Sequence, residues 1–260
     1  MKRRYLKLLN KEEESKLIRI LPDEVEYMIP IWLMKTGKCK VYRNLDSTEL
    51  EFACVSNNIN RPDAWIYGSP ESKELAEWFV SYNQKIDFIG IVSLKEMMLK
   101  QVEHKKSDYI DYHILNEKSN QPEFRDSNAP ILLGAEHSQL FQKLDEEGKS
   151  FFGEWSNIDE ALEESIIYGV TDSDKLLSFA LTFAVTNKFM ELGVWTKESH
   201  RRRGFSFACS NALIERIFSE SKIPVWGTER GNVASMSLAR KLGFKKVHEY
   251  YWVTRFERWF

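Results

Sequence analysis

Residues 191–206 read Glu-Leu-Gly-Val-Trp-Thr-Lys-Glu-Ser-His-Arg-Arg-Arg-Gly-Phe-Ser, and this stretch decides the expected fold. The first part is typical of a strand that ends near Thr196, and a helix is expected to begin within residues 202–204. The first amide groups of a helix lack intrahelical partners and lie at the positive end of its dipole. Gly204 lets backbone approach a ligand closely, and arginines 201–203 add donors suited to phosphate. The stretch therefore predicts a pyrophosphate site at a helix start.

Two other interpretations of the same stretch stay open. The arginines could form a solvated run of charge beside an ordinary turn at Gly204, because short glycine motifs often match by chance. They could also belong to a surface that binds DNA or RNA. The chain, however, has 37 basic and 39 acidic residues and a net charge of -2. General nucleic-acid binders usually carry a basic surplus, so we expect no nucleic-acid partner.

Length and composition place the chain among ordinary globular proteins. Of its 260 residues, 43% are hydrophobic and 29% are charged, which suits two domains or one domain with a large extension. We find no apolar run long enough to span a membrane and no signal-peptide pattern, so no membrane partner is expected. Three widely spaced cysteines, Cys39, Cys54 and Cys209, fit a reducing compartment. We therefore expect a cytoplasmic protein.

Strands and helices are expected to alternate along the chain. Asn10 followed by Glu13 predicts a capping box at a first helix, and Gly243 predicts the end of a late one. The first half shows strand patterns at residues 38–43, 50–56, 86–92 and 109–115. Residues 116–130 are polar and contain two prolines, which marks the best candidate for a linker. After it we expect strands at residues 166–170, 176–185, 190–196, 224–226 and 246–254, with helices at 203–220 and 232–242.

These patterns predict an α/β (α+β) protein in two parts. Residues 1–128 would form an N-terminal α/β domain of unknown role, and residues 131–260 would form the domain that carries the phosphate loop. No internal repeat is evident in the sequence.

Two motifs, in order and at suitable spacing, resemble the GNAT superfamily of acyl-CoA-dependent N-acetyltransferases. The phosphate loop of that family reads Gln/Arg-x-x-Gly-x-Gly/Ala, which Arg201-Arg-Arg-Gly-Phe-Ser206 matches with serine in the last small position. A later motif reads Asn-x-x-Ala/Ser before a helix that ends Lys-x-Gly-Phe, matched by Asn232-Val-Ala-Ser235 and Lys241-Leu-Gly-Phe244. Residues 226–244 also look like the branch that contains the zwittermicin-resistance acetyltransferase.

The resemblance implies a C-terminal GNAT fold, in which helices flank a mixed, splayed central sheet, and acetyl-CoA as co-substrate. The strand before the phosphate loop would lie beside the pantetheine arm, and the backbone of residues 202–206 would hold the pyrophosphate. Asn232 matches an asparagine that contacts the pantetheine arm, although asparagine also caps helices unaided. The positions assigned to the coenzyme are Val194, Thr196, Arg201, Arg202, Arg203, Gly204, Phe205, Ser206, Asn232 and Ser235.

The resemblance also implies direct attack of a neutral amine on the acetyl thioester, with a base to deprotonate the ammonium. Glu191 matches the position of a water-mediated glutamate base in some members, and a solvent-facing strand carboxylate is the alternative. The usual acid, a tyrosine seven residues after the motif asparagine, is replaced by Ala239. Tyr250 and Tyr251 are the candidate substitutes. They point to opposite faces of a strand, so at most one can serve.

We therefore expect an N-acetyltransferase that acetylates a primary amine of a small molecule. The first domain would shape the acceptor site or a homodimer. No metal is expected, because the five histidines lack the spacing of a zinc site. The alternative is a non-catalytic acyl-CoA-binding module, or an interaction protein that shares the fold, and the missing tyrosine at position 239 favours it.

Overall fold

The computed structural model describes residues 6–58, 62–82, 86–101, 106–117 and 129–254. Within these residues, one continuous sheet runs in the order β1-β2-β3-β4-β5-β12-β6-β11-β10-β9-β8-β7. Its strands are β1 (Lys7–Leu8), β2 (Cys39–Arg43), β3 (Phe52–Ser56), β4 (Asp63–Tyr67), β5 (Asp87–Ile91), β6 (Lys106–Ile114), β7 (Ile131–Leu133), β8 (Ile167–Asp172), β9 (Lys175–Val185), β10 (Phe189–Thr196), β11 (Ile223–Glu229) and β12 (Lys245–Thr254).

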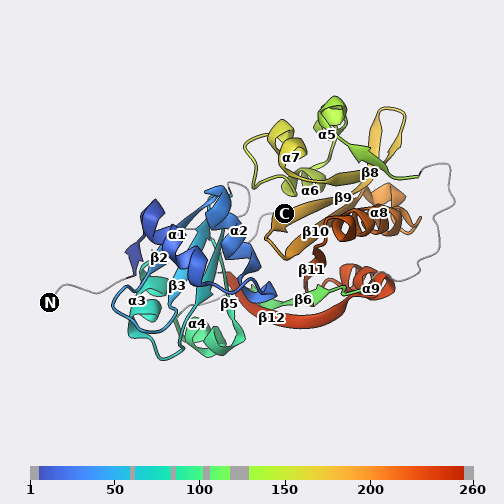
Figure 1. Cartoon of the computed structure of the whole chain (residues 1–260). Helices are drawn as coiled ribbons and strands as arrows, with labels where there is room; N and C mark the ends of the chain where they lie inside the picture. The colour runs from blue at the N-terminus through green and yellow to red at the C-terminus, as the bar shows by residue number, and fades with distance from the viewer. Residues whose placement is uncertain (1–5, 59–61, 83–85, 102–105, 118–128, 255–260) are drawn as a thin grey trace.

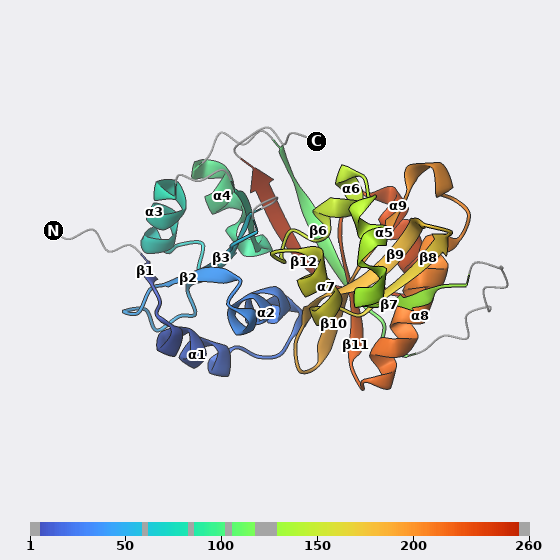
Figure 2. The ribbon, with the colours of Figure 1, turned by 90° about the horizontal axis from the view of Figure 1, so that it is seen from above.

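The helices lie on both faces of this sheet. They are α1 (Lys11–Ile20), α2 (Met28–Thr36), α3 (Lys73–Ser81), α4 (Lys95–Gln101), α5 (Ser138–Gln142), α6 (Glu146–Ser150), α7 (Ile158–Glu164), α8 (Phe205–Ser219) and α9 (Val233–Leu242). Four 3₁₀ turns accompany them: η1 (Val25–Tyr27), η2 (Val92–Leu94), η3 (Ala135–His137) and η4 (Glu198–His200). Figure 2 shows α1 and α2 on one face of β2 and β3, and α3 and α4 on the other. None of the helices in the described part of the chain is long and apolar enough to cross a membrane.

Two of the predicted helix ends are confirmed. The Asn10 side chain accepts hydrogen bonds from the amides of Glu12 and Glu13, and the Glu13 carboxylate accepts one from the Asn10 amide, which completes the capping box. Gly243 ends α9 with a φ of 92°, a left-handed conformation that glycine adopts at little cost.

The same succession of elements occurs twice, which corrects the expectation that no repeat is present. The first copy is β2-β3-β4-α3-β5-α4-β6 and the second is β8-β9-β10-α8-β11-α9-β12. In each copy three antiparallel strands are followed by a helix and by a strand that pairs in parallel with the third. The N-terminal half is therefore built on the plan of the C-terminal half.

The two copies exchange their last strands. β6, from the first copy, pairs antiparallel with β11 of the second, and β12 pairs antiparallel with β5 of the first. β6 and β12 also pair with each other at the centre of the sheet. Figure 1 shows these two strands running between the blue-to-teal N-terminal elements and the yellow-to-orange C-terminal ones.

This exchange bears on the predicted division at residues 128–131. β6 lies before that division in the sequence, yet in the sheet it stands between β12 and β11. Residues 118–128, which make up most of the predicted linker, lie outside the described residues. The boundary stays a prediction, and the hydrogen-bonded sheet continues across it.

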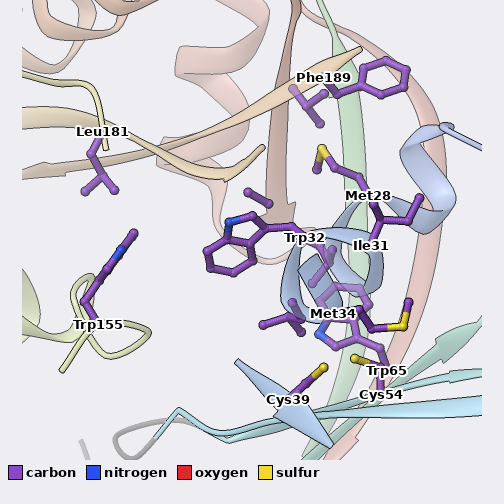
Figure 3. Close-up of a cluster of buried hydrophobic side chains, with 14 of the residues drawn as sticks. Met28, Ile31, Trp32, Met34, Cys39, Cys54, Trp65, Trp155, Leu181 and Phe189 are labelled. Carbon is purple, nitrogen blue, oxygen red and sulfur yellow. The ribbon is translucent and has the colours of Figure 1, made fainter. Parts of the chain in front are cut away.

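An apolar core crosses between the halves on one face of the sheet. The indole of Trp32, on α2, lies 6.4 Å from that of Trp155 and 6.5 Å from the ring of Phe183 on β9. Figure 3 shows Trp32 pointing from α2 toward Trp155, with Met28 and Phe189 on its other side. The opposite face of the C-terminal half is covered by α8 and α9, whose apolar residues pack with Leu192 and Trp226.

We predict that Trp32→Ala destabilises the whole chain by about 3–5 kcal/mol, because it leaves a large cavity in a core shared by both halves. Ile20→Ala is the matched control, since Ile20 is 59% exposed on α1 and its truncation is expected to cost within about 0.5 kcal/mol. Urea unfolding followed by tryptophan fluorescence and by circular dichroism measures both. Equal losses for the two variants would contradict the shared core.

Candidate active site

The parallel strands β10 and β11 part from each other after a short paired segment. They are in register only from Phe189 to Glu191, opposite residues 223–225, although β10 continues to Thr196 and β11 to Glu229. Each strand remains paired along its outer edge, β10 with β9 and β11 with β6. The register of β10 with β9 is irregular at Glu191, and such irregularities bend a strand. The central sheet is therefore splayed, as the sequence motifs implied.

The equivalent strands of the first copy stay closed. β4 and β5 pair from Asp63 to Ile66, opposite residues 87–90, which is nearly the full length of β4. The loop that follows β4 contains Glu71 and no arginine before α3 begins. The opening and the basic loop thus occur together, and only the second copy has them among the described residues.

The opening continues into a groove of about 970 Å³ that reaches the start of α8 and passes along α9. Most of the positions assigned to a coenzyme line it, namely Val194, Thr196, Arg201, Arg202, Gly204, Phe205, Ser206, Asn232 and Ser235. Arg203 is the assigned position that is not among the lining residues; its guanidinium lies over the Phe205 ring, 4.8 Å from the centroid.

The loop before α8 has the conformation of an anion cradle. Gly204 has a φ of 86° and Arg202 a φ of 63°, so two residues of this turn are left-handed. Gly204 is the residue before α8, and no side chain caps this helix end. The first amides of a helix without such a cap need an outside acceptor. Their position at the positive end of the dipole favours a negatively charged one.

Arg201 is engaged within the protein. Its guanidinium donates two hydrogen bonds to the Glu147 carboxylate of α6, at 2.8 and 2.5 Å, and its Nε donates to the Thr196 carbonyl at 3.1 Å. Arg202 also lines the groove. The Arg201 ion pair instead ties α6 to the phosphate loop at the edge of the groove.

Asn232 and Ser235 connect α9 to the splayed strand. The Asn232 side chain accepts a hydrogen bond from the Ser235 amide at 3.1 Å, which confirms it as the N-cap of α9. The Ser235 hydroxyl in turn accepts one from the Trp226 indole of β11 at 3.0 Å. Both residues also line the groove, and contact of Asn232 with a pantetheine arm stays a prediction.

Glu191 stands where the two strands separate, and its side chain points to the face opposite α8. An ideal Cβ built on Gly227 of β11 would lie 2.5 Å from the Glu191 Oε1 and 2.9 Å from a ring carbon of Tyr112. Desolvation of the carboxyl raises the pKa of Glu191 to about 8, and hydrogen bonding with the Tyr112 side chain acts in the opposite direction. Glu191 is therefore a partly buried residue whose carboxyl is desolvated and has a raised pKa.

Of the two candidate tyrosines, only Tyr250 lies on the side of Glu191. Its ring is 5.5 Å from that of Tyr112, and its hydroxyl donates to the Glu26 carbonyl and meets the Tyr67 hydroxyl at 3.1 Å. Tyr251 points to the other face of β12, against the Tyr109 ring and the Lys95 ammonium. The structure does not bring Tyr251 to the site.

Sequence reasoning missed Tyr112 and Gly227. Tyr112 lies opposite Gly227 in the register of β6 with β11, so both flank the Glu191 carboxyl. The Tyr-Ile-Asp-Tyr-His pattern of residues 109–113 indicates a strand but carries no sign of its partner. Only the exchange of strands between the copies places Tyr112 beside the Glu191 carboxyl.

The histidines of this region are held neutral. Burial lowers the pKa of His113 and of His248, and each has one buried ring nitrogen without a hydrogen-bond partner. In the described ranges, no three His, Cys, Asp or Glu side chains come together in a way that could hold a metal ion.

Comparison with known proteins adds independent findings. A family model described as GNAT acetyltransferase matches residues 40–253. A curated Bacillus subtilis (strain 168) protein named uncharacterized N-acetyltransferase YdfB is 25% identical over 96 residues. That match spans 37% of this chain and 37% of the length of the relative, so it leaves most of both chains unmatched.

Solved structures resemble almost the whole chain. A GCN5-related N-acetyltransferase-like protein from Streptococcus suis has a TM-score of 0.68 at 16% identity, over 94% of this chain and 98% of that one. A tandem GNAT protein from the clavulanic acid biosynthesis pathway has a TM-score of 0.59 at 9% identity, over 95% and 97%. At these identities the likeness concerns the fold.

The raised pKa of Glu191 makes a prediction about stability that does not depend on activity. The unfolded chain loses this proton near the ordinary value of 4.5 and the folded chain near 8, so wild-type stability falls relative to Glu191→Gln as pH rises through that window. We expect Glu191→Gln to gain about 2–5 kcal/mol relative to wild type between pH 5 and pH 9. Urea unfolding of both proteins at each pH measures the difference. A difference independent of pH would show that the carboxyl is solvated.

Proposed function

The chain belongs to the GNAT acetyltransferase family, and from that premise we propose that it transfers the acetyl group of acetyl-CoA to a primary amine of a small molecule. One observation carries the proposal. The opening between β10 and β11 is continuous with the uncapped start of α8, in a single groove. An elongated ligand with an anionic end fits such a groove better than a compact one does.

The residues present fit acetyl-CoA. The amides after Gly204 would hold the pyrophosphate, with the Arg202 side chain beside them. Along the edge of β10 that faces the opening, the backbone groups near Val194 and Thr196 would bond the amides of the pantetheine arm, because β11 no longer pairs with them. Lys241 of α9 lines the same groove and adds positive charge near the phosphates.

Acetyl-CoA supplies an activated acyl group, a thioester. In the overall reaction a bond forms between the amine nitrogen and the acetyl carbon, the carbon–sulfur bond breaks, and the sulfur takes up a proton. The ammonium form of the acceptor must first lose a proton, and Glu191 would accept it, directly or through a water molecule. A carboxylate with a pKa of about 8 is a stronger base than an ordinary glutamate.

The acceptor would approach on the face of the sheet that carries Glu191. On that face the rings of Phe183 and Phe151 pack against Gly193, where an ideal Cβ would lie 3.1 and 3.2 Å from them. Aromatic side chains packed against the strand favour a small acceptor over a protein chain. The neighbouring aromatic rings suit a cationic amine.

The proton for the departing sulfur would come from a group other than residue 239. Ala239 is fully buried in the core between α9 and the sheet, so this position faces away from the groove. The alanine at position 239, in place of the tyrosine usual in the family, favours the second candidate function, a protein that binds acyl-CoA without turnover.

Glu191→Gln should lower kcat by about 10²–10⁴-fold, because the variant lacks the general base. Thiol release from acetyl-CoA across a panel of small primary amines measures the rate. Affinity for CoA should stay the same, since Glu191 is not part of the groove lining. If no amine supports thiol release by wild type while CoA binds, the non-catalytic candidate replaces the enzyme.

Gly204→Ala should weaken CoA binding at least about tenfold, since a side chain is strained at positive φ and distorts the cradle. Gly37→Ala is the matched control: Gly37 is also left-handed, with a φ of 71°, but it ends α2 far from the groove lining. Calorimetry should give one site per chain for wild type and Gly37→Ala, because β4 and β5 leave no second opening among the described residues. Equal loss of affinity in both variants would contradict the cradle.

A further inference from the structure

Tyr112 lies at the junction of the two copies, on β6, the strand of the N-terminal half that pairs with β11 beside the opening. β6 pairs with β11 from Ile110 to Ile114, and this register sets Tyr112 directly opposite Gly227. Tyr112 as a whole is 3% exposed. A buried phenol normally needs a polar partner.

The polar group beside it is the Glu191 carboxyl. Glu191 Oε1 and the Tyr112 ring both lie where a Cβ at Gly227 would otherwise stand. β11 stands between β6 and β10 in the sheet, so Tyr112 and Glu191 are not on neighbouring strands. They can meet because Gly227 of β11, between them, has no side chain. Any larger residue at position 227 would separate them.

The charged groups around this pair affect the pKa values of Tyr112 and Tyr250 more than that of Glu191. Tyr250 of β12 packs its ring against Tyr112, and its own hydroxyl is used by the Glu26 carbonyl and Tyr67. The negative charge of Asp63, on β4, acts on Tyr112, and that of Glu26, before α2, acts on Tyr250. Burial and the Glu191 charge raise the pKa of Tyr112, so this phenol keeps its proton and serves as a donor.

We propose that Tyr112 is a positioning residue for Glu191: its phenol, supplied by the N-terminal half, holds the carboxyl beside Gly227 and favours the ionised form that accepts a proton. The inference rests on the proposed role of Glu191 as the base. Tyr112 belongs to the first half and Glu191 to the second, so the exchanged strand β6 gives the first half a direct part in the reaction.

The test is Tyr112→Phe, which keeps the ring and removes the donor. Without that donor the pKa of Glu191 rises further, so the acidic limb of the kcat/KM profile should move up by about 0.5–1 pH unit. At pH 7 this shift corresponds to a fall of about 3–10-fold, which is recovered as the pH rises. Tyr109→Phe is the matched control, since Tyr109 lies on the same strand but points to the other face, where its hydroxyl accepts from Lys95.

A second measurement separates this inference from the proposed function. The pH-dependent stability difference between Glu and Gln at position 191 is measured again in the Tyr112→Phe background. Movement of that difference to higher pH supports the contact, even where Glu191→Gln leaves turnover intact and the proposed base fails. An unchanged kcat/KM limb together with an unchanged stability difference overturns the inference.

Gly227→Ala covers the case in which Tyr112→Phe does not fold. Its methyl group would push the Glu191 carboxyl and the Tyr112 ring apart, so the acidic limb should again move to higher pH. A Gly227→Ala enzyme with the wild-type profile would count against the inference.

Discussion

The end of parallel pairing between β10 and β11 at Glu191 is the constraint on which the rest of the site depends. Backbone groups inside a sheet are costly to leave without hydrogen-bond partners, so an interrupted ladder persists only where water or a ligand can take them. Both strands are fixed on their outer edges by β9 and β6, and the opening is therefore a rigid feature of the fold. The closed pair β4 and β5 shows that the same plan can also be built without an opening.

The exchange of β6 and β12 explains why the N-terminal half matters to that opening. Strands from one copy complete the sheet of the other, and the Trp32 core joins them on one face. β6 pairs with β11 from Val225 to Glu229, which includes the segment after Val225 where β10 no longer pairs with β11. Removal of the first half would leave β11 without a neighbour on either edge there, so the two copies form one structural unit in spite of their repeated plan.

Local features of this chain were predictable because their causes are local. The Asn10 capping box, the Gly243 helix end and the Asn232 cap follow from short-range hydrogen bonding, and the start of α8 follows from a glycine before a helix. The repeat and the strand exchange were not predictable, because alternation of apolar residues indicates a strand without naming its partner. Arg201 illustrates the same limit, since its pairing with Glu147 depends on tertiary contact.

Glu191 shows how the fold places two opposing effects on one group. Burial raises the pKa of its carboxyl, while the nearby Tyr112 phenol lowers it, and burial is the larger effect. A desolvated carboxyl costs stability, so its presence at the strand separation is easier to explain by chemistry than by packing. The phenol comes from the first copy and the carboxyl from the second. The balance that sets this proton affinity therefore exists only when the two copies are joined.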